Sequence, residues 1–353
     1  MKYVGLDWAY RRAQWCALGP GGDVAGEGRI PADRDGLARL VLGLGDEVKA
    51  CLEMMSGALW VRDELVACGW QVEVADARKV KTVAPLAAKT DKVDARLLAE
   101  LSRRELVPAL WLPSFDERAL RERLRRRMHL VRLRTSAKGR IFGLQTQWGV
   151  RVSLARLRRA DGLTLLERAG VPAVWRHSVS ECLALIDFLD ARLEPLDREL
   201  KPFAKADPRA VLLDTIPGVA ELLALTIAVE IGDISRFRRP AHLVSYGRLA
   251  PRVHQSGQAR ARSGPLSKSG SRLLGWAAVE AAQHAWRETN PWHDLYLDVA
   301  RRSRHTNSAK AAVARKILTA AWHMLSRTEP FNPAPRSVGG APVPASSPVA
   351  LAA

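Results

Sequence analysis

Residues 2–9, Lys-Tyr-Val-Gly-Leu-Asp-Trp-Ala, form a short apolar run that ends close to a carboxylate, Asp7. A run of this kind predicts a buried β-strand. Residues 13–18 and 24–30 predict two further strands, separated by a Gly-Pro-Gly-Gly turn at residues 19–22. The three segments together predict an antiparallel meander at the start of a sheet.

Helices and strands alternate after this meander. The apolar spacing predicts a helix over residues 33–44, a strand over 48–53, a helix over 59–68 and a strand over 71–75. Strands that are joined through a helix usually pair in parallel. The start of the chain therefore predicts a mixed α/β sheet. In open sheets of this kind, functional residues collect beyond the carboxyl ends of the strands.

Four acids could meet at such an edge. Asp7 and Glu53 end predicted strands, and Asp91 and Asp94 stand three residues apart where a helix is predicted to begin, so they share one helix face. Taken singly, the strand-end acids could be solvent-exposed, and Asp91 and Asp94 could be an N-cap and an N3 residue. Four carboxylates together would instead suit Mg²⁺ or Mn²⁺, and two such ions support phosphoryl transfer.

The composition is strongly basic, with 55 Lys and Arg against 37 Asp and Glu and a net charge of +18. Nucleic acid is the commonest partner of such a surplus, and an acidic membrane surface is the alternative. No apolar run of membrane-spanning length and no leader-like N-terminus is present, so we expect a soluble, intracellular protein. Four scattered cysteines without a CxxC pair argue against a zinc site and a disulfide framework. The length allows two domains.

A basic helix is predicted in the middle of the chain. Residues 118–140 contain ten Lys and Arg and one acid, a net charge of +9, around an apolar stripe at helical spacing. Such a helix is a nucleic-acid arm, a membrane-surface helix or a solvated member of a bundle, and its many arginines favour the first. The residues expected to bind nucleic acid here are Arg121, Arg125, Arg126, Arg127 and Arg132.

Three further helices are predicted, over residues 179–200, 273–286 and 308–325. The first carries an approximate heptad of Leu and Ile. It could pair with the basic helix as an antiparallel hairpin or with another subunit. An apolar helix over residues 221–231 follows a Pro-Gly turn, which either presents N–H groups to a phosphate or simply joins two helices.

Residues 254–272 are polar, with serines and glycines between basic residues. This composition fits a flexible loop that contacts DNA. Alternatively, one serine is a nucleophile toward phosphorus, and neighbouring cations stabilise the charge that develops. The candidate cations are Arg260, Arg262, Lys268 and Arg272.

Two sets of motifs resemble one known family. Val-Gly-Leu-Asp at residues 4–7, Leu-Glu at 52–53 and Lys-x-Asp-x-x-Asp-Ala at 89–95 are similar to the RuvC-like, ribonuclease-H-fold domain of the DEDD transposases. Ile-Pro-Gly-Val at 216–219, Glu-Ile-Gly-Asp-Ile-x-Arg-Phe at 230–237, Ser-Gly at 256–257 and Lys-x-Gly-x-x-x-Leu at 268–274 resemble the second domain of that family. Its members are bacterial insertion-sequence recombinases, related to pilin-inverting DNA invertases. The resemblance covers about residues 2–328.

The resemblance implies a transposase that cuts and rejoins DNA in the bacterial cytoplasm, at the nucleoid. Its metal ligands and catalytic acids would be Asp7, Glu53, Asp91 and Asp94, with Mg²⁺ or Mn²⁺ as cofactor. The family's catalytic serine precedes a glycine and maps onto Ser256, where many members carry a second serine in place of Gln255. The resemblance also implies a composite site of acids and serine, a transient phosphoserine bond and a structured guide RNA. It further implies a homo-oligomer, either a dimer or a tetramer.

We therefore expect four parts. These are a RuvC-like catalytic domain over residues 1–112, a basic coiled-coil linker over 113–206, a mainly helical serine-bearing domain over 207–328 and a disordered Pro-rich tail over 329–353. Two other functions stay open. One is a metal-dependent junction-resolving nuclease without a covalent intermediate, and the other is a non-catalytic nucleic-acid-binding protein.

Overall fold

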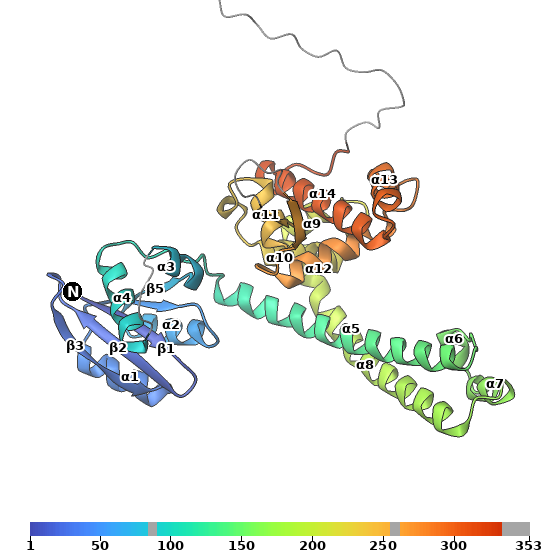
Figure 1. Ribbon diagram of the computed structural model, residues 1–353, viewed down its shortest axis with the longest axis horizontal. Coiled ribbons are helices and arrows are strands. Elements are labelled where there is room, and N and C mark those ends of the chain that lie inside the picture. The colour runs from blue at the N-terminus through green and yellow to red at the C-terminus, as the bar shows by residue number, and fades with distance from the viewer. Residues whose placement is uncertain (84–89, 255–261, 334–353) are drawn as a thin grey trace, which may run out of the picture. The chain divides into compact units, whose positions relative to one another are not determined.

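The computed structural model describes residues 1–83, 90–254 and 262–333. The chain divides into two compact units, Met1–Leu112 and Pro113–Ala353. The first unit contains a twisted sheet with helices, and the second is almost entirely helical (Figure 1). Most of the predicted Pro-rich tail, from residue 334 on, lies outside the described residues.

A five-stranded sheet forms the centre of the first unit. Its strands are β1 (Lys2–Trp8), β2 (Arg12–Leu18), β3 (Val24–Pro31), β4 (Val48–Glu53) and β5 (Gln71–Ala75). The order across the sheet is β3-β2-β1-β4-β5. The β1–β2 and β2–β3 pairs are antiparallel, whereas β1–β4 and β4–β5 are parallel. The predicted mixed sheet, a meander followed by parallel strands, is confirmed.

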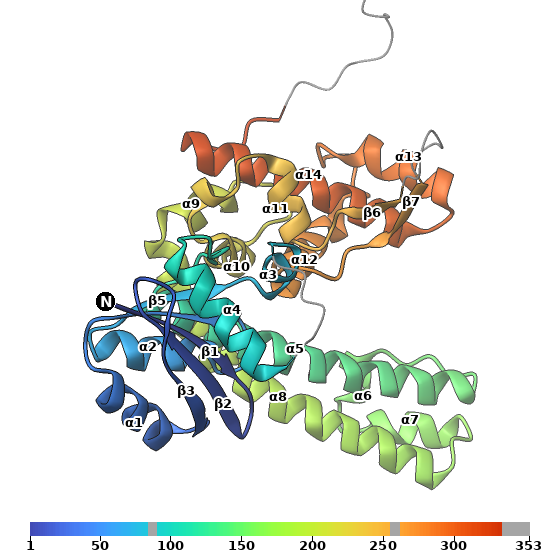
Figure 2. The same cartoon turned by 60° about the vertical axis from the view of Figure 1, so that its left-hand side comes forward.

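Helices cover both faces of this sheet (Figure 2). They are α1 (Arg34–Leu44), α2 (Ala58–Ala67), α3 (Ala77–Val83) and α4 (Asp91–Arg103). On one face, Leu6 of β1 packs in one cluster with Leu37 of α1 and Leu65 of α2. On the other face, Leu18 of β2 packs with Ala95 of α4. This alternation follows from the two-residue period of a strand, which sends successive side chains to opposite faces.

The start of α4 differs by one residue from the expectation. Its N-cap is Thr90, whose hydroxyl oxygen accepts a hydrogen bond from the Val93 N–H at 3.3 Å. The alternative in which Asp91 is the N-cap and Asp94 the N3 residue is therefore excluded, because Thr90 has the capping role. Asp91 is the first helical residue, and Asp94 still lies three residues further on the same face.

Two long helices, α5 (Phe115–Gln147) and α8 (Ala173–Ala206), lie side by side in the second unit (Figures 1 and 2). The short helices α6 (Leu154–Leu157) and α7 (Gly162–Arg168) connect them. The order of their ion pairs shows that the two helices run antiparallel, since the partners rise in number along α5 and fall along α8. These pairs are Arg123–Glu199, Arg127–Asp197 and Arg134–Asp190. The structure thus selects the hairpin within the chain.

The predicted heptad stripe on α8 is confirmed, since its members are all buried. They are Leu183, Ile186, Leu189, Leu193 and Leu196. From α5, Leu124 and Met128 pack in the same cluster as Leu196 and Leu200 of α8. The hairpin is therefore joined by an apolar seam with arginine–carboxylate pairs alongside it.

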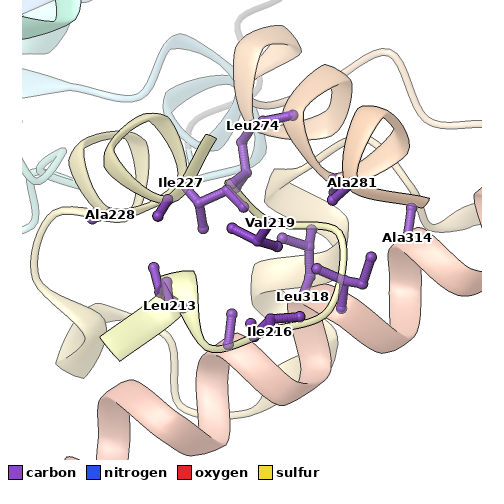
Figure 3. Close-up of a cluster of buried hydrophobic side chains, with 14 of the residues drawn as sticks. Leu213, Ile216, Val219, Ile227, Ala228, Leu274, Ala281, Ala314 and Leu318 are labelled. Carbon is purple, nitrogen blue, oxygen red and sulfur yellow. The ribbon is translucent and has the colours of Figure 1, made fainter. Parts of the chain in front are cut away.

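Shorter helices form the rest of the second unit, and the prediction of a mainly helical region is confirmed. They are α9 (Pro208–Asp214), α10 (Glu221–Ile231), α11 (Pro240–Tyr246), α12 (Arg272–Ala281), α13 (His293–Ser303) and α14 (Thr306–Arg327), with 3₁₀ turns at Ile234–Arg236 and Ala282–His284. Figure 3 shows Leu213, Ile227 and Leu318 gathered in the core that these helices share.

The Pro-Gly turn before α10 is part of this core. Gly218 has a φ of +91°, and a Cβ there would lie 2.3 Å from the carbonyl oxygen of Ala281. Ile216 and Val219, on either side, are buried. Only glycine fits so close to the backbone of α12. The geometry favours a turn that joins two helices over one that faces a phosphate.

Candidate functional site

Asp7 and Glu53 lie next to each other at the carboxyl ends of β1 and β4. These strands are parallel, and their register pairs Leu6 with Leu52. Asp7 and Glu53 are the next residues on each strand, so both point to the face opposite to the two leucines. Both side chains are half-buried. The sheet therefore brings two carboxylates from distant parts of the sequence to one edge.

Helix α4 packs on this same face and runs antiparallel to β1. A Cβ at Gly5 would lie 1.9 Å from the carbonyl oxygen of Ala95, so the helix backbone rests directly on the strand. At the far end of α4, Arg103 donates a hydrogen bond of 3.3 Å to the carbonyl oxygen of Pro20, in the turn after β2. Since β1 and β2 are antiparallel, that turn adjoins the amino end of β1. The first turn of α4 thus lies at the carboxyl end of β1.

Asp91 and Asp94 are in that first turn, and α4 packs on the face of the sheet to which Asp7 and Glu53 point. All four donors are carboxylates, the ligand type that Mg²⁺ and Mn²⁺ prefer, so the residue types fit such an ion. Within the described ranges, no three His, Cys, Asp or Glu side chains lie close enough together to hold a metal ion. The four-acid metal site remains a prediction, and Lys89, where its motif starts, lies outside those ranges.

The predicted serine loop joins two short antiparallel strands in the second unit, β6 (Pro251–His254) and β7 (Arg262–Leu266). Ser256 and Arg260 lie outside the described residues. After β7, the Ser267 N–H donates to the Ala250 carbonyl oxygen at 2.9 Å and closes the base of the hairpin. Lys268 follows and is exposed.

The arginines of α5 do not form one uniform surface. Arg126 and Arg132 are exposed, whereas the side chain of Arg127 is mostly buried and pairs with Asp197. Arg121 is only 6% exposed, and its guanidinium donates to the Val229 carbonyl oxygen at 2.8 and 3.0 Å. The prediction that Arg121 binds nucleic acid is contradicted, because its charged group is used inside the protein.

A cavity of about 520 Å³ lies between α5, α11 and the start of α12. Its polar lining residues are Arg125, His129, Arg132, Glu230, Ser271 and Arg272. Glu230 is 1% exposed and accepts hydrogen bonds from the Ser271 hydroxyl at 2.7 Å and from Arg125 at 3.4 Å. The sequence predicted the three arginines but missed His129, Glu230 and Ser271. Ser271 stands directly before an apolar helical pattern, the position of an N-cap, and this signal could have identified it.

Comparisons with known proteins agree with the motifs. The family described as Transposase IS116/IS110/IS902 matches residues 210–297, and the DEDD transposase family of IS110 matches residues 4–147. The chain belongs to this family of insertion-sequence transposases. Its resemblance to that family, noted from the motifs, is confirmed.

Several relatives are similar to this transposase over most of its length. The transposase for insertion sequence element IS1111A of Coxiella burnetii is 26% identical, over 94% of this chain and 92% of its own. A probable family 20 transposase of Pseudomonas aeruginosa is 26% identical, over 81% and 87%. A pilin gene-inverting protein of Moraxella bovis is 27% identical, over 69% and 68%.

The charge of the transposase is divided unequally between its two units. Residues 1–112 contain 16 Lys and Arg and 16 Asp and Glu, so the entire net charge of +18 belongs to residues 113–353. An excess of this size attracts polyanions. None of the helices in the described part of the chain has the length and apolar character needed to cross a membrane. The basic surplus therefore lies in the unit that holds the arginine-rich helix and the serine hairpin.

Proposed function

We propose that this transposase cuts and rejoins DNA with Ser256 as nucleophile, assisted by divalent ions at Asp7, Glu53, Asp91 and Asp94. The observation that supports the proposal is that Asp7 and Glu53 end neighbouring parallel strands, and that α4, which starts with Asp91 and Asp94, packs on the same face of the sheet. The sheet order, with α4 across β1, also supports a ribonuclease-H-like domain. Mg²⁺ or Mn²⁺ held there would stabilise negative charge on the oxygens of a phosphodiester.

The residues of the chain have separate roles in this proposal. The Ser256 hydroxyl oxygen attacks phosphorus, a DNA oxygen leaves, and a phosphoserine ester joins protein and DNA. The ester retains the energy of the broken bond, so a DNA hydroxyl can later displace the serine and reseal the strand. Arg260, Arg262 and Lys268, around this loop, would bind the phosphates of the strand.

Two variants test the chemistry on supercoiled DNA that carries the ends of the element, together with the flanking RNA. Ser256→Ala should abolish a labelled protein–DNA adduct that survives denaturation, whereas Ser263→Ala in the same segment should retain it. An adduct that persists in Ser256→Ala would exclude this nucleophile. Cleavage without any adduct in the unmodified protein would indicate a junction-resolving nuclease.

The acids are tested separately from the serine. Asp94→Asn should remove Mg²⁺-dependent cleavage and leave DNA affinity nearly unchanged, because the net positive charge is in the other unit. Asp46→Asn is a matched control, since Asp46 is an exposed acid of the same unit in the turn before β4. Equal cleavage by both variants would rule out the acid cluster. Loss of binding in Asp94→Asn would mean that the acid has a structural role.

We further propose a structured RNA from the element as a guide and a homo-oligomer as the active form. Arg126, exposed on α5, suits an RNA backbone. Phe142 of α5 and Phe188 of α8 are 69% and 55% exposed, which suits contact with another subunit. Ribonuclease treatment should abolish cleavage, and sedimentation should show a dimer or tetramer. Full activity after ribonuclease treatment would exclude the guide.

A further inference from the structure

The arginines of α5 differ in whether an acid neutralises them. On the side that faces α8, Arg123, Arg127 and Arg134 each form an ion pair with a carboxylate of that helix. At the cavity between α5, α11 and α12, Arg132 and Arg272 form no ion pair with any carboxylate in the described ranges. One side of the helix is balanced internally, and the other side is left with surplus positive charge.

These two unbalanced guanidiniums are close enough to influence each other. Partial burial lowers the pKa of Arg132, and the positive charge of Arg272 lowers it further. Like charges that face a common cavity repel each other and destabilise the fold unless an anion lies between them. The cavity therefore has the electrostatic character of an anion site.

Glu230 does not cancel this surplus. Its carboxylate is already used by the Ser271 hydroxyl and by Arg125. Ser271 also accepts the Leu274 N–H at 3.1 Å and so caps α12. Glu230 thus balances Arg125 and fixes the start of α12, whose amino end adds partial positive charge beside Arg272. Two guanidiniums and a helix terminus remain without a counter-charge.

We propose that this cavity binds one backbone phosphate of a DNA strand, together with the nucleoside attached to it, near the phosphate that Ser256 attacks. The proposal rests on the function proposed above. Residues 270–273, which line the cavity, come only a few residues after β7, so the cavity is close along the chain to the segment that contains Ser256. The volume of about 520 Å³ exceeds what a phosphate needs. The rings of His129 and Tyr246 in its wall supply surfaces on which a sugar or base can pack.

The number of phosphate contacts can be measured from the salt dependence of DNA binding. The slope of log affinity against log salt concentration falls by about 0.9 for each lost contact with duplex DNA. The full-length double variant Arg132→Gln/Arg272→Gln should show a slope shallower by about 0.9 on a short fluorescein-labelled DNA duplex, because one phosphate contact is lost, and Arg272→Gln alone should show a smaller decrease. An unchanged slope in both variants overturns the proposal.

A control variant loses the same charge outside the cavity. Arg123→Gln/Arg302→Gln removes two arginines that are already paired, with Glu199 and Asp298. Its slope should stay within error of the unmodified protein. If the control lowers the slope as much as the cavity variant does, net charge alone explains the effect, and the proposal fails. A shallower slope on an RNA duplex only would likewise refute a DNA site.

The position of the phosphate is tested with methylphosphonate, which removes the charge of one phosphate at a time. When methylphosphonate replaces each phosphate of the element's end in turn, the unmodified protein should lose affinity at one position near the cleaved bond. The affinity of Arg272→Gln should not change at that position. Insensitivity of the unmodified protein at every position overturns the proposal. Ser256→Ala should lose affinity at the same position as the unmodified protein. If the unmodified protein forms no covalent adduct but still has this sensitive position, only the serine chemistry is refuted. An adduct with no sensitive position would refute the cavity alone.

Discussion

Arg121 shows how a single residue differs from what its neighbours predict. It stands among many arginines, and composition alone assigns it to a nucleic-acid surface. Its position, however, is three residues before Leu124 and seven before Met128, which places it on the apolar stripe of the helix. Burial lowers the pKa of its guanidinium, yet the carbonyl oxygens of Val229 and Glu230 at the end of α10 solvate it. Arg121 therefore caps α10.

Arg121→Ala should lower the free energy of unfolding by about 3 kcal/mol, because it leaves carbonyl groups of α10 buried and unsatisfied. Urea unfolding followed by tryptophan fluorescence would measure this loss. Arg126→Ala, five residues further and exposed, should change stability by less than about 0.5 kcal/mol. Equal effects of the two variants would contradict the capping role.

Cysteine reactivity provides a second test at single residues. Burial, together with the nearby carboxylates of Glu73 and Glu53, raises the pKa of the Cys51 thiol to about 12. Only the thiolate reacts, so Cys51 should resist iodoacetamide at pH 8 in the folded protein. Cys68 is exposed and should be alkylated under the same conditions. Mass spectrometry of the labelled peptides would decide, and rapid labelling of Cys51 would contradict its burial.

At the level of elements, the sequence pattern predicts most of the first unit. Period-two and period-3.6 patterns locate all the strands of the sheet and the helices α1 and α2 to within about one or two residues, whereas for α4 only the start, at Asp91, was expected. The short helices α3, α6 and α7 were not predicted, because they span too few turns to show a period. The pairing of α5 with α8 stayed open, since a heptad stripe does not specify its partner. The order of the ion pairs decided it.

Gly5 makes the close contact between β1 and α4 possible. Gly5→Ala would place a methyl group 1.9 Å from the Ala95 carbonyl oxygen, so the helix has to shift. We expect a loss of about 1–3 kcal/mol, as for overpacked cores, and reduced Mg²⁺-dependent cleavage, because Asp91 and Asp94 move with the helix. Thermal unfolding and the cleavage assay would measure both effects. Gly43→Ala, in α1 and with open space around it, should leave cleavage unchanged and stabilise the protein slightly.

The end of α4 carries a pH-dependent contact. Hydrogen bonds from Arg103, together with Arg104, lower the pKa of Glu100 to about 2 from its usual 4.5. Because the pKa is lower in the folded state, the contact stabilises above about pH 4.5, and this contribution is lost as the pH falls toward 2. Glu100→Gln should therefore be less stable than the unmodified protein near neutral pH and approach it below pH 4.5. A constant difference in urea midpoint across that interval would contradict this linkage.

On the scale of the whole molecule, the two units differ in charge as well as in fold. Residues 1–112 have no net charge and bury their own core clusters, which contain Leu6, Leu52 and Leu98. A fragment of these residues should unfold cooperatively in urea and bind DNA weakly, with a salt slope near zero. Circular dichroism and fluorescence anisotropy would test both points. Tight, salt-sensitive binding by the fragment would contradict the assignment of DNA binding to residues 113–353.

The predictability of the candidate site also depends on scale. The shared edge of Asp7 and Glu53 follows from the rule that parallel strands end together, so it could be predicted from the sequence. The cavity could not. Arg132, Glu230 and Arg272 come from three helices far apart in the chain, and no local pattern indicates that these helices meet. The basic composition of α5 and of residues 254–272 predicted that the arginines of the cavity bind nucleic acid. Which of these arginines lack an acid partner depends on how the helices pack, and the composition does not show this.

The neutrality of the first unit has a consequence for the host cell. If the proposed metal-dependent cleavage belongs to this neutral unit, its weak attraction for a polyanion would limit random nicking of the chromosome by a truncated product that ends near Leu112. Damage would then depend on recognition by the other, basic part of the chain.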